Sequence, residues 1–289
     1  MTRRLFLLIL ALAMPSAASA GVPETVYLPS ADGRTEIVGY LFKPASNGPH
    51  PGIVLLHGRS GPYSANVNAA CTLVARSNGS PCKAATLSRR HRMWGDYWAA
   101  RGHLALLIDS FGPRGKAHGF GRFTHGDANR DDVNEKTVRP LDAEGALAWL
   151  RRRGDVVADS IFLQGWSNGG STALNVLHRQ GTSSSGFRAA LVFYPGCGPK
   201  AMLGPVLATA APVTMFLASD DEEVSPETCQ RFAERSRNAG SPVEIVLYKG
   251  ATHGFDDPGA ARQSLAANRS AGADALRRAI AILQAQRAR

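Results

Sequence analysis

Residues 165–170 most constrain what this chain can fold into, because they read GWSNGG between an apolar run and a helix-forming run. The apolar run at 161–163 predicts a strand that ends at the turn, and the Ala- and Leu-rich residues 171–177 predict a helix after it. Glycine two residues before and after Ser167 tolerates the tight backbone of such a turn. Strand, turn and helix form the context of a G-x-S-x-G nucleophile elbow, and they favour it over a Gly-rich turn that merely contains serine.

The rest of the chain alternates strands with helices, which predicts a mostly parallel sheet flanked by helices. Two period-2 runs, 25–28 and 37–42, surround an Asp-Gly turn and predict a β-hairpin. No repeat or linker divides the sequence, so we expect residues 21–289 to fold as a single α/β domain. Further strands are expected at 52–56, 104–108, 161–164, 189–193, 212–218 and 243–248, and helices at 93–101, 141–150, 171–177, 227–239 and 273–285.

Residues 1–20 have the three parts of a secretory signal peptide. Arg3 and Arg4 supply positive charge, residues 5–14 are apolar, and residues 18–20 read ASA, as at a cleavage site. We therefore expect removal of this segment and a periplasmic or secreted protein. The very short charged part favours general export over the twin-arginine route. No later stretch is long and apolar enough to cross a membrane, so we expect no stable insertion after signal removal.

The chain is basic, with a formal net charge of +10 at pH 7 that falls by two when the signal is removed. Nucleic-acid binding needs clustered Lys and Arg with interleaved aromatic residues. Here the arginines are scattered, and the one dense run, residues 151–153, ends a predicted helix, where cations are favourable. We expect no nucleic-acid partner, although the charge would suit anionic substrates or membrane surfaces.

Four cysteines in an exported chain favour two disulfides. Three pairings are possible, and the alternative is four unpaired small apolar side chains. A Cys71–Cys82 bond would close a local loop within residues 62–92, where we also expect a helix. A Cys197–Cys229 bond would join two loops that follow successive strands.

The longest stretch without apolar periodicity, residues 116–139, is expected to form a loop that walls or covers a pocket. It contains His118 and His125, which could be interpreted as metal ligands, but neither has a spaced partner. No Cys/His spacing indicates zinc either. The sequence therefore predicts no metal and no cofactor.

A serine nucleophile needs a base within hydrogen-bond reach and a carboxylate that holds the base in its tautomer. Along this chain Ser167 follows one strand, four consecutive carboxylates follow a strand two further on, and His253 follows the last strand. Since the carboxyl ends of parallel strands share one edge of a sheet, we predict a catalytic triad of Ser167, Asp221 and His253. Asp220 and Glu222 remain alternatives for the acid.

A second turn with glycines, HGRSG at residues 57–61, follows the predicted strand at 52–56. Glycines there let backbone N–H groups point into a site, and the first N–H groups of a helix have no partner within it. At a nucleophile elbow the oxyanion hole is formed by the N–H after the serine and an N–H from a loop of this kind, so we expect the backbone N–H groups of Asn168 and Arg59 to form it.

Three further side chains are predicted to contact the substrate: His57, Trp166 and Arg114. Arg114 follows a strand end, and its guanidinium could pair with a substrate carboxylate. The alternative for Arg114 is a purely structural arginine.

Several segments together match the pattern of one known family. They read LLHG at 55–58, DSFGPRG at 109–115, GWSNGG at 165–170, YPG at 194–196, the acid-bearing loop at 217–226, and HGF at 253–255. In these segments the chain resembles the dienelactone hydrolase family, within the α/β-hydrolase fold. The matches run in family order over nearly all of the mature chain, and the HGF and DSFGPRG segments are the more specific. The resemblance implies hydrolysis of an ester or a lactone.

Two departures from that family bear on the chemistry. Members that open dienelactones have cysteine at the elbow, where this chain has Ser167, and a glutamate near the position of His57. The elbow therefore resembles that of an ordinary serine esterase, and we expect small esters or lactones to be cleaved through an acyl-enzyme. The usual family pattern after the catalytic acid is D-x-x-V-P, and in this chain Pro226 comes one residue later than that pattern requires. The identity of the catalytic acid therefore stays undecided. An acyltransferase, a peptidase or a non-catalytic binding protein are the alternatives, and the oligomeric state and natural substrate stay open.

Overall fold

The computed structural model describes residues 21–124, 127–201 and 203–287, so the predicted signal peptide lies outside the described residues. Its centre is an eight-stranded sheet of order β1-β2-β4-β3-β5-β6-β7-β8. β1 and β2 form the predicted antiparallel hairpin, β2 pairs antiparallel with β4, and all other neighbours are parallel. The strands are β1 (Glu24–Pro29), β2 (Glu36–Phe42), β3 (His50–Leu56), β4 (Leu104–Asp109), β5 (Val156–Trp166), β6 (Ala190–Phe193), β7 (Val213–Ala218) and β8 (Val243–Tyr248).

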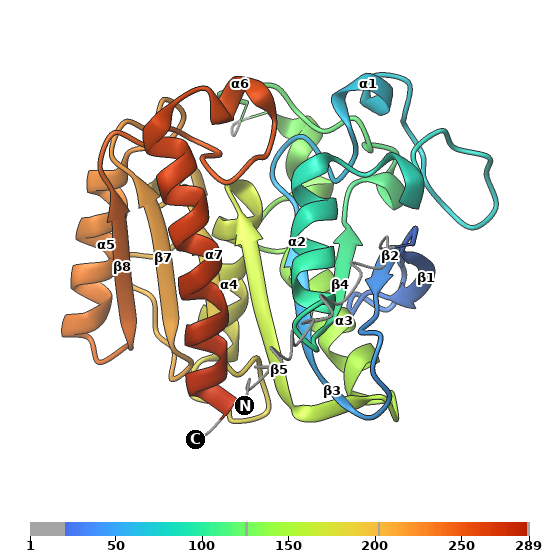
Figure 1. The fold of residues 1–289 in the computed structure, drawn as a ribbon, viewed down its shortest axis with the longest axis horizontal. Coiled ribbons are helices and arrows are strands. Elements are labelled where there is room, and N and C mark those ends of the chain that lie inside the picture. The colour runs from blue at the N-terminus through green and yellow to red at the C-terminus, as the bar shows by residue number, and fades with distance from the viewer. Residues whose placement is uncertain (1–20, 125–126, 202, 288–289) are drawn as a thin grey trace, which may run out of the picture.

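Helices cover both faces of this sheet, as Figure 1 shows. The main helices on one face are α3, α4 and α5, which share a hydrophobic cluster with the strands, while α2 and α7 cover the other face. The fold is therefore the α/β-hydrolase architecture expected from the sequence. The helices are α1 (Ala65–Asn68), α2 (Arg89–Ala99), α3 (Arg139–Arg151), α4 (Asn168–Gln180), α5 (Pro226–Asn238), α6 (Ala260–Gln263) and α7 (Ala266–Arg287).

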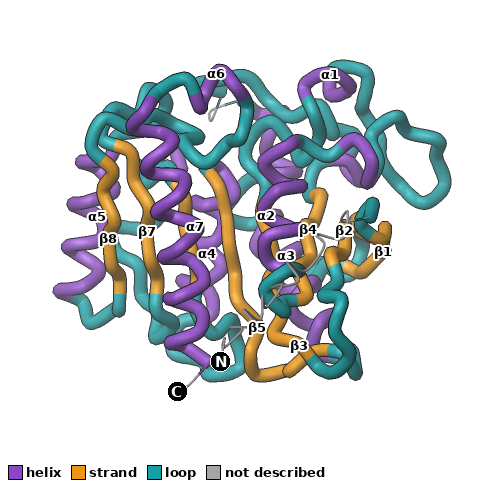
Figure 2. Tube along the Cα trace, in the orientation of Figure 1, coloured by secondary structure: helices purple, strands orange, loops and turns teal. Residues whose placement is uncertain are grey.

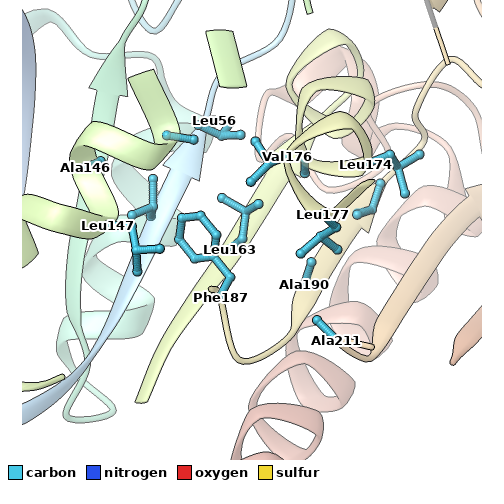
Figure 3. Packing of buried hydrophobic residues seen from close by; sticks show 14 of the residues in the cluster. Leu56, Ala146, Leu147, Leu163, Leu174, Val176, Leu177, Phe187, Ala190 and Ala211 are labelled. Atoms are coloured by element: carbon cyan, nitrogen blue, oxygen red, sulfur yellow. The ribbon is translucent and has the colours of Figure 1, made fainter. Parts of the chain in front are cut away.

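The central strands are buried on both faces, which explains their continuous apolar runs. Figure 3 shows Leu56 of β3 and Leu163 of β5 beside Val176 and Leu177 of α4. All four side chains are buried. Each such side chain contributes about 2 kcal/mol when it leaves water. This packing holds α4 against β3 and β5.

Loops gather at the carboxyl ends of the parallel strands, at the top of Figure 2. Residues 62–92 contain the single turn α1 and a 3₁₀ turn at Ala84–Thr86 before α2 begins. α2 starts four residues earlier than predicted, because the side chain of Ser88 caps it by accepting the N–H of His91. The stretch expected as a loop, 116–139, carries a 3₁₀ helix at Ala128–Val133. In the ranges that the structure describes, no helix combines the length and the hydropathy needed to cross a membrane.

The cysteines form two disulfides, Cys71–Cys82 and Cys197–Cys229. The first closes a loop of sequence separation 11 beside α1. The second has a separation of 32 and joins the loop after β6 to α5. Of the three pairings left open by the sequence, the fold selects this one because it places these sulfurs side by side.

Candidate active site

Ser167 stands at the sharp turn between β5 and α4. Its backbone has a φ of 53°, a strained value for a residue other than glycine. A Cβ at Gly165 would come within 2.2 Å of the Gly169 carbonyl oxygen, and a Cβ at Gly169 within 2.1 Å of the Leu56 carbonyl oxygen. Both flanking glycines are therefore required by close backbone approach. The turn has the strand–serine–helix geometry of a nucleophile elbow, with Ser167 half-buried at its apex.

His253, in the loop after β8, lies between Ser167 and Asp221. Its Nε2 is 3.0 Å from the Oγ of Ser167, and its Nδ1 is 2.9 Å from Oδ2 and 3.0 Å from Oδ1 of Asp221. The Asp221 side chain is only 1% exposed. A carboxylate accepts hydrogen bonds, so it holds the proton on Nδ1 and leaves Nε2 as the acceptor that faces the serine hydroxyl. The fold thus brings together three residues from three loops in the arrangement predicted from the sequence.

The other carboxylates of the acid loop have different partners. An oxygen of Asp220 accepts the hydroxyl of Ser219, while Glu222 accepts the backbone N–H of His253 and a bond from Arg262. Burial would raise the pKa of Glu222, but these bonds and the charge of Arg262 outweigh it and lower the pKa to about 2. Asp221 differs because its Oδ1 also accepts the N–H groups of the two residues at 223 and 224, which fix its carboxylate toward His253.

The two residues whose backbone N–H groups are expected to form an oxyanion hole, Asn168 and Arg59, line the same cavity as Ser167. Asn168 is the first residue of α4, so its N–H has no acceptor within the helix. Arg59 follows β3, and the carbonyl of Gly58, in the same peptide group as the Arg59 N–H, accepts bonds from His57 Nδ1 and Gly61 N. The peptide group that carries the Arg59 N–H is thereby fixed in direction.

A cavity of about 390 Å³ opens at Ser167. Ser167, Asn168 and Arg59 all line it, together with the loop after β6 and the start of α5. The remaining lining residues are Ser171, Gly196, Cys197, Gly198, Pro199, Ala201, Val224, Ser225, Thr228, Arg122, Phe123 and Glu223. The wall is mainly small and apolar, and three charged side chains stand at one side.

Residues 89–286 match the model of the dienelactone hydrolase family, a stretch that includes Ser167, Asp221 and His253. The chain belongs to the dienelactone hydrolase family. The match covers more than half of the chain and runs from α2 to α7, so the carboxyl-terminal strands that carry these three residues lie within it.

Solved structures share the fold of this dienelactone hydrolase family member. A protein of Klebsiella pneumoniae subsp. pneumoniae MGH 78578, named as a candidate dienelactone hydrolase, aligns with 17% identity and a TM-score of 0.66 over 91% of this chain and 98% of its own. A dienelactone hydrolase-like promiscuous phosphotriesterase from metagenomic libraries aligns with 18% identity and a TM-score of 0.64, over 92% of this chain and 99% of its own. An esterase of Thermogutta terrifontis with bound propionate aligns with 21% identity and a TM-score of 0.59, over 93% of this chain and 96% of its own. At these identities the likeness shows a common fold.

The structure corrects the three predicted substrate contacts of this family member. Arg114 does not line the cavity; its guanidinium binds both oxygens of the buried Asp142 at 2.8 and 2.9 Å. The indole of Trp166 is fully buried and donates to Asp256 at 2.8 Å. His57 is fully buried as well, behind the loop that carries Arg59. Trp166 ends β5, His57 follows β3 directly, and Arg114 ends a 3₁₀ turn after β4, but none of the three is among the residues that line the cavity.

One of the charged side chains that line the cavity, Glu223, was not singled out from the sequence. Glu223 binds Arg59 at 3.1 and 3.2 Å and Arg122 at 2.9 Å, and one of its oxygens lies 3.8 Å from His253 Nε2. Burial tends to raise the pKa of Glu223, but the hydrogen bonds from Arg59 and the surrounding positive charges lower it on balance. The available sequence signal was that Glu223 lies two residues after Asp221. Four consecutive carboxylates, however, do not indicate which side chain points toward the cavity.

Tyr194 was also not singled out. Its ring lies 4.6 Å from the ring of His253, and its hydroxyl donates to the buried Asp256. Among the described residues, no group of three or more His, Cys, Asp or Glu side chains is arranged to hold a metal ion.

Proposed function

We propose that this protein is a serine hydrolase that cleaves carboxylic esters or lactones of small substrates through an acyl-enzyme. The observation that carries the proposal is the unbroken line of hydrogen bonds from Asp221 through His253 to Ser167, which ends at a cavity. A serine hydroxyl is a weak nucleophile until a base removes its proton. Membership of the dienelactone hydrolase family supports the same chemistry.

In the first step Nε2 of His253 takes the hydroxyl proton as Oγ of Ser167 bonds to the carbonyl carbon of the substrate. Asp221 holds the Nδ1 proton and stabilises the imidazolium that forms. The carbonyl oxygen gains the negative charge and accepts the N–H groups of Asn168 and Arg59. Loss of one such donor costs about 3 kcal/mol, or roughly a hundredfold in rate.

When the tetrahedral species collapses, the bond from the carbonyl carbon to the leaving oxygen breaks and His253 donates its proton to that oxygen. A water molecule then attacks the acyl-enzyme, with His253 as the base, and the acid product leaves as Ser167 regains its proton. In a lactone the leaving oxygen becomes a hydroxyl group on the acyl chain itself, so no product departs in the first step, and the second step releases the whole hydroxy acid.

The dimensions of the cavity support a small substrate. Sites for small molecules measure about 300–1,000 Å³, and this cavity, at about 390 Å³, lies near the lower limit. Its apolar wall, from the loop after β6 and Val224, suits a hydrocarbon part of the substrate. A hydroxyl nucleophile in place of a thiol favours simple esters and lactones over the dienelactones themselves.

We further propose that residues 1–20 direct export and that residues 21–289 act as a single domain outside the cytoplasm. The charged and apolar parts of the first twenty residues support export, and two disulfides among residues 71–229 suit an oxidising compartment. One sheet that includes strands from both ends of the described chain supports the single domain.

A fluorophosphonate probe tests the nucleophile. The mature protein is expected to be labelled, Ser167→Ala is expected to lose labelling, and Ser183→Ala, an exposed serine in the loop after α4, serves as the matched control. Labelling of the Ser167→Ala variant to the wild-type extent would refute the assignment.

A panel of short-chain nitrophenyl esters, lactones and amides then tests the reaction class. Hydrolysis of esters or lactones that disappears in Ser167→Ala is the expected result. Amide hydrolysis alone would indicate a peptidase, and acyl transfer to an added alcohol in preference to water would indicate an acyltransferase. Labelling without turnover of any of these substrates would count against the proposed activity.

A further inference from the structure

A buried arginine connects the two sides of the candidate oxyanion hole. Arg139 is the first residue of α3, and its side chain is fully buried. It is not among the residues that line the cavity. One guanidinium nitrogen donates to the side-chain oxygen of Asn168, and the other donates to the backbone carbonyl of His57 at 2.7 Å.

These two acceptors belong to the two segments that supply the oxyanion donors. Asn168 carries one donor on its own backbone nitrogen, at the start of α4. His57 lies two residues before Arg59, the other donor, in the loop after β3. The segments come from different strand ends, and the planar fork of one guanidinium holds both at a fixed separation.

A second hydrogen bond links His57 to the peptide group that carries the Arg59 N–H. The Nε2 of His57 faces the backbone N–H of Ser110, which leaves its Nδ1 to donate to the Gly58 carbonyl at 2.8 Å. Burial and the charge of Arg139 hold the pKa of His57 well below its usual range, so the ring is neutral and this tautomer is maintained. Fixing the position of His57 therefore fixes the direction of the Arg59 N–H.

Arg139 also places a positive charge behind the hole. Burial lowers the pKa of Arg139 to about 10, which still leaves it protonated at neutral pH. Both hydrogen bonds that its side chain makes in the described part of the chain go to neutral oxygens. Carboxylates of Glu135 and Asp142 act on it through charge, and the ring of Phe111 lies 4.9 Å from its Cζ. A buried charge is costly in free energy unless hydrogen bonds and opposite charges compensate it, and here two hydrogen bonds and these carboxylates do so.

We propose that Arg139 is a positioning residue that pre-organises the oxyanion hole by clamping the Asn168 side chain to the loop after β3. The inference rests on the proposed hydrolase function, since an oxyanion hole matters only if a carbonyl is attacked. Donors that are already aligned stabilise the charge of the transition state without reorganisation, and the uncharged ground state gains little from them. Loss of Arg139 therefore lowers kcat and leaves KM nearly unchanged.

Steady-state hydrolysis of the best ester from the panel tests this role. Arg139→Met is expected to lower kcat about 30- to 100-fold, in the range that a misaligned oxyanion donor costs. Arg139→Lys keeps the charge but not the fork, and is expected to recover part of the loss. Affinity for an alkylboronic acid, which forms a tetrahedral adduct with the serine, is expected to fall by a similar factor. Affinity for the carboxylate product is expected to stay the same.

Two further variants separate clamping from general loss of stability. Arg114→Met removes another arginine with a buried carboxylate partner, outside the cavity, and is the matched control with kcat expected at the wild-type value. Asn168→Ala removes the acceptor of Arg139 but keeps the backbone N–H, and is expected to lower kcat about tenfold. In the double variant Arg139→Met/Asn168→Ala the losses are expected not to add, because both break the same contact.

The outcomes distinguish the two proposals. Wild-type kcat in a folded Arg139→Met variant, a rise in KM alone, or a fall in kcat without loss of boronate affinity would each overturn the role of Arg139. If Arg139→Met does not fold, wild-type kinetics in Asn168→Ala would overturn it instead. A wild-type protein that neither hydrolyses esters nor reacts with the probe would overturn the proposed function itself, and this inference with it.

Discussion

The Cys197–Cys229 disulfide is expected to stabilise both the fold and the wall of the cavity. The bond closes a loop of sequence separation 32, and the chain-entropy relation gives about 4 kcal/mol for a loop of that length. The Cys71–Cys82 bond closes a separation of 11, which gives about 3 kcal/mol. Against a typical total stability of about 5–15 kcal/mol, either loss is large.

The two bonds differ more in function than in stability. Cys197 lines the cavity, as does Thr228 beside Cys229, so the disulfide holds the loop after β6 against the start of α5. Cys71 and Cys82 lie outside the residues that line it. Removal of the first bond is therefore expected to raise KM for the ester, whereas removal of the second is expected to leave KM unchanged.

The variants Cys197→Ala/Cys229→Ala and Cys71→Ala/Cys82→Ala test this by urea unfolding, followed by tryptophan fluorescence. Kinetics are measured well below the unfolding midpoint, so that only folded protein contributes. The reasoning is refuted if the first variant loses less than about 1 kcal/mol in the free energy of unfolding, far below the chain-entropy figure. An equal rise in KM for both variants would refute the functional part.

Two further predictions concern charged groups. Arg114→Met is expected to lower the free energy of unfolding by about 3–5 kcal/mol, because it leaves the buried Asp142 carboxylate unpaired. Arg179→Met, which breaks a solvent-exposed pair, is the control and is expected to change this free energy little. Unchanged stability of the Arg114→Met variant would contradict this prediction. Glu222 has a pKa lowered from 4.5 to about 2, so its stabilising contribution is complete above pH 4.5 and is lost as the pH falls toward 2. Wild-type stability is thus expected to fall more steeply than that of Glu222→Gln across this window in acid-unfolding measurements; parallel curves would contradict it.

Local pattern was enough to predict the architecture. Each of the predicted strands is present. A buried strand is recognisable from a continuous apolar run, and a hairpin is recognisable from alternating residues on both sides of an Asp-Gly turn. Helix ends were less well predicted: α7 begins at Ala266, seven residues before the expected start, and α4 begins directly at Asn168. Helix ends depend on caps and packing, which the periodicity of the interior does not record.

The elbow and the order of the three candidate catalytic residues were also readable from the sequence. Ser167 and His253 each follow a recognisable strand, and parallel topology places strand ends at one edge. The sequence left three candidates for the acid, because neighbouring carboxylates have the same composition and the same strand end. In the fold only Asp221 reaches the Nδ1 of His253, since its carboxylate is held by two backbone N–H groups of its own loop.

Side-chain partners were decided by the tertiary structure alone. Arg114 was expected at a substrate and instead binds Asp142, while Glu223 and Arg139 were not expected at the site at all. A strand end fixes where a Cα lies, but which way a long side chain turns depends on the charges that other elements bring near it. The sequence by itself therefore determined the sheet, the elbow and the order of the three candidate catalytic residues along the chain. Only the packed chain decided the partners of each charge, because those partners are separated by many residues and meet only when the sheet is formed.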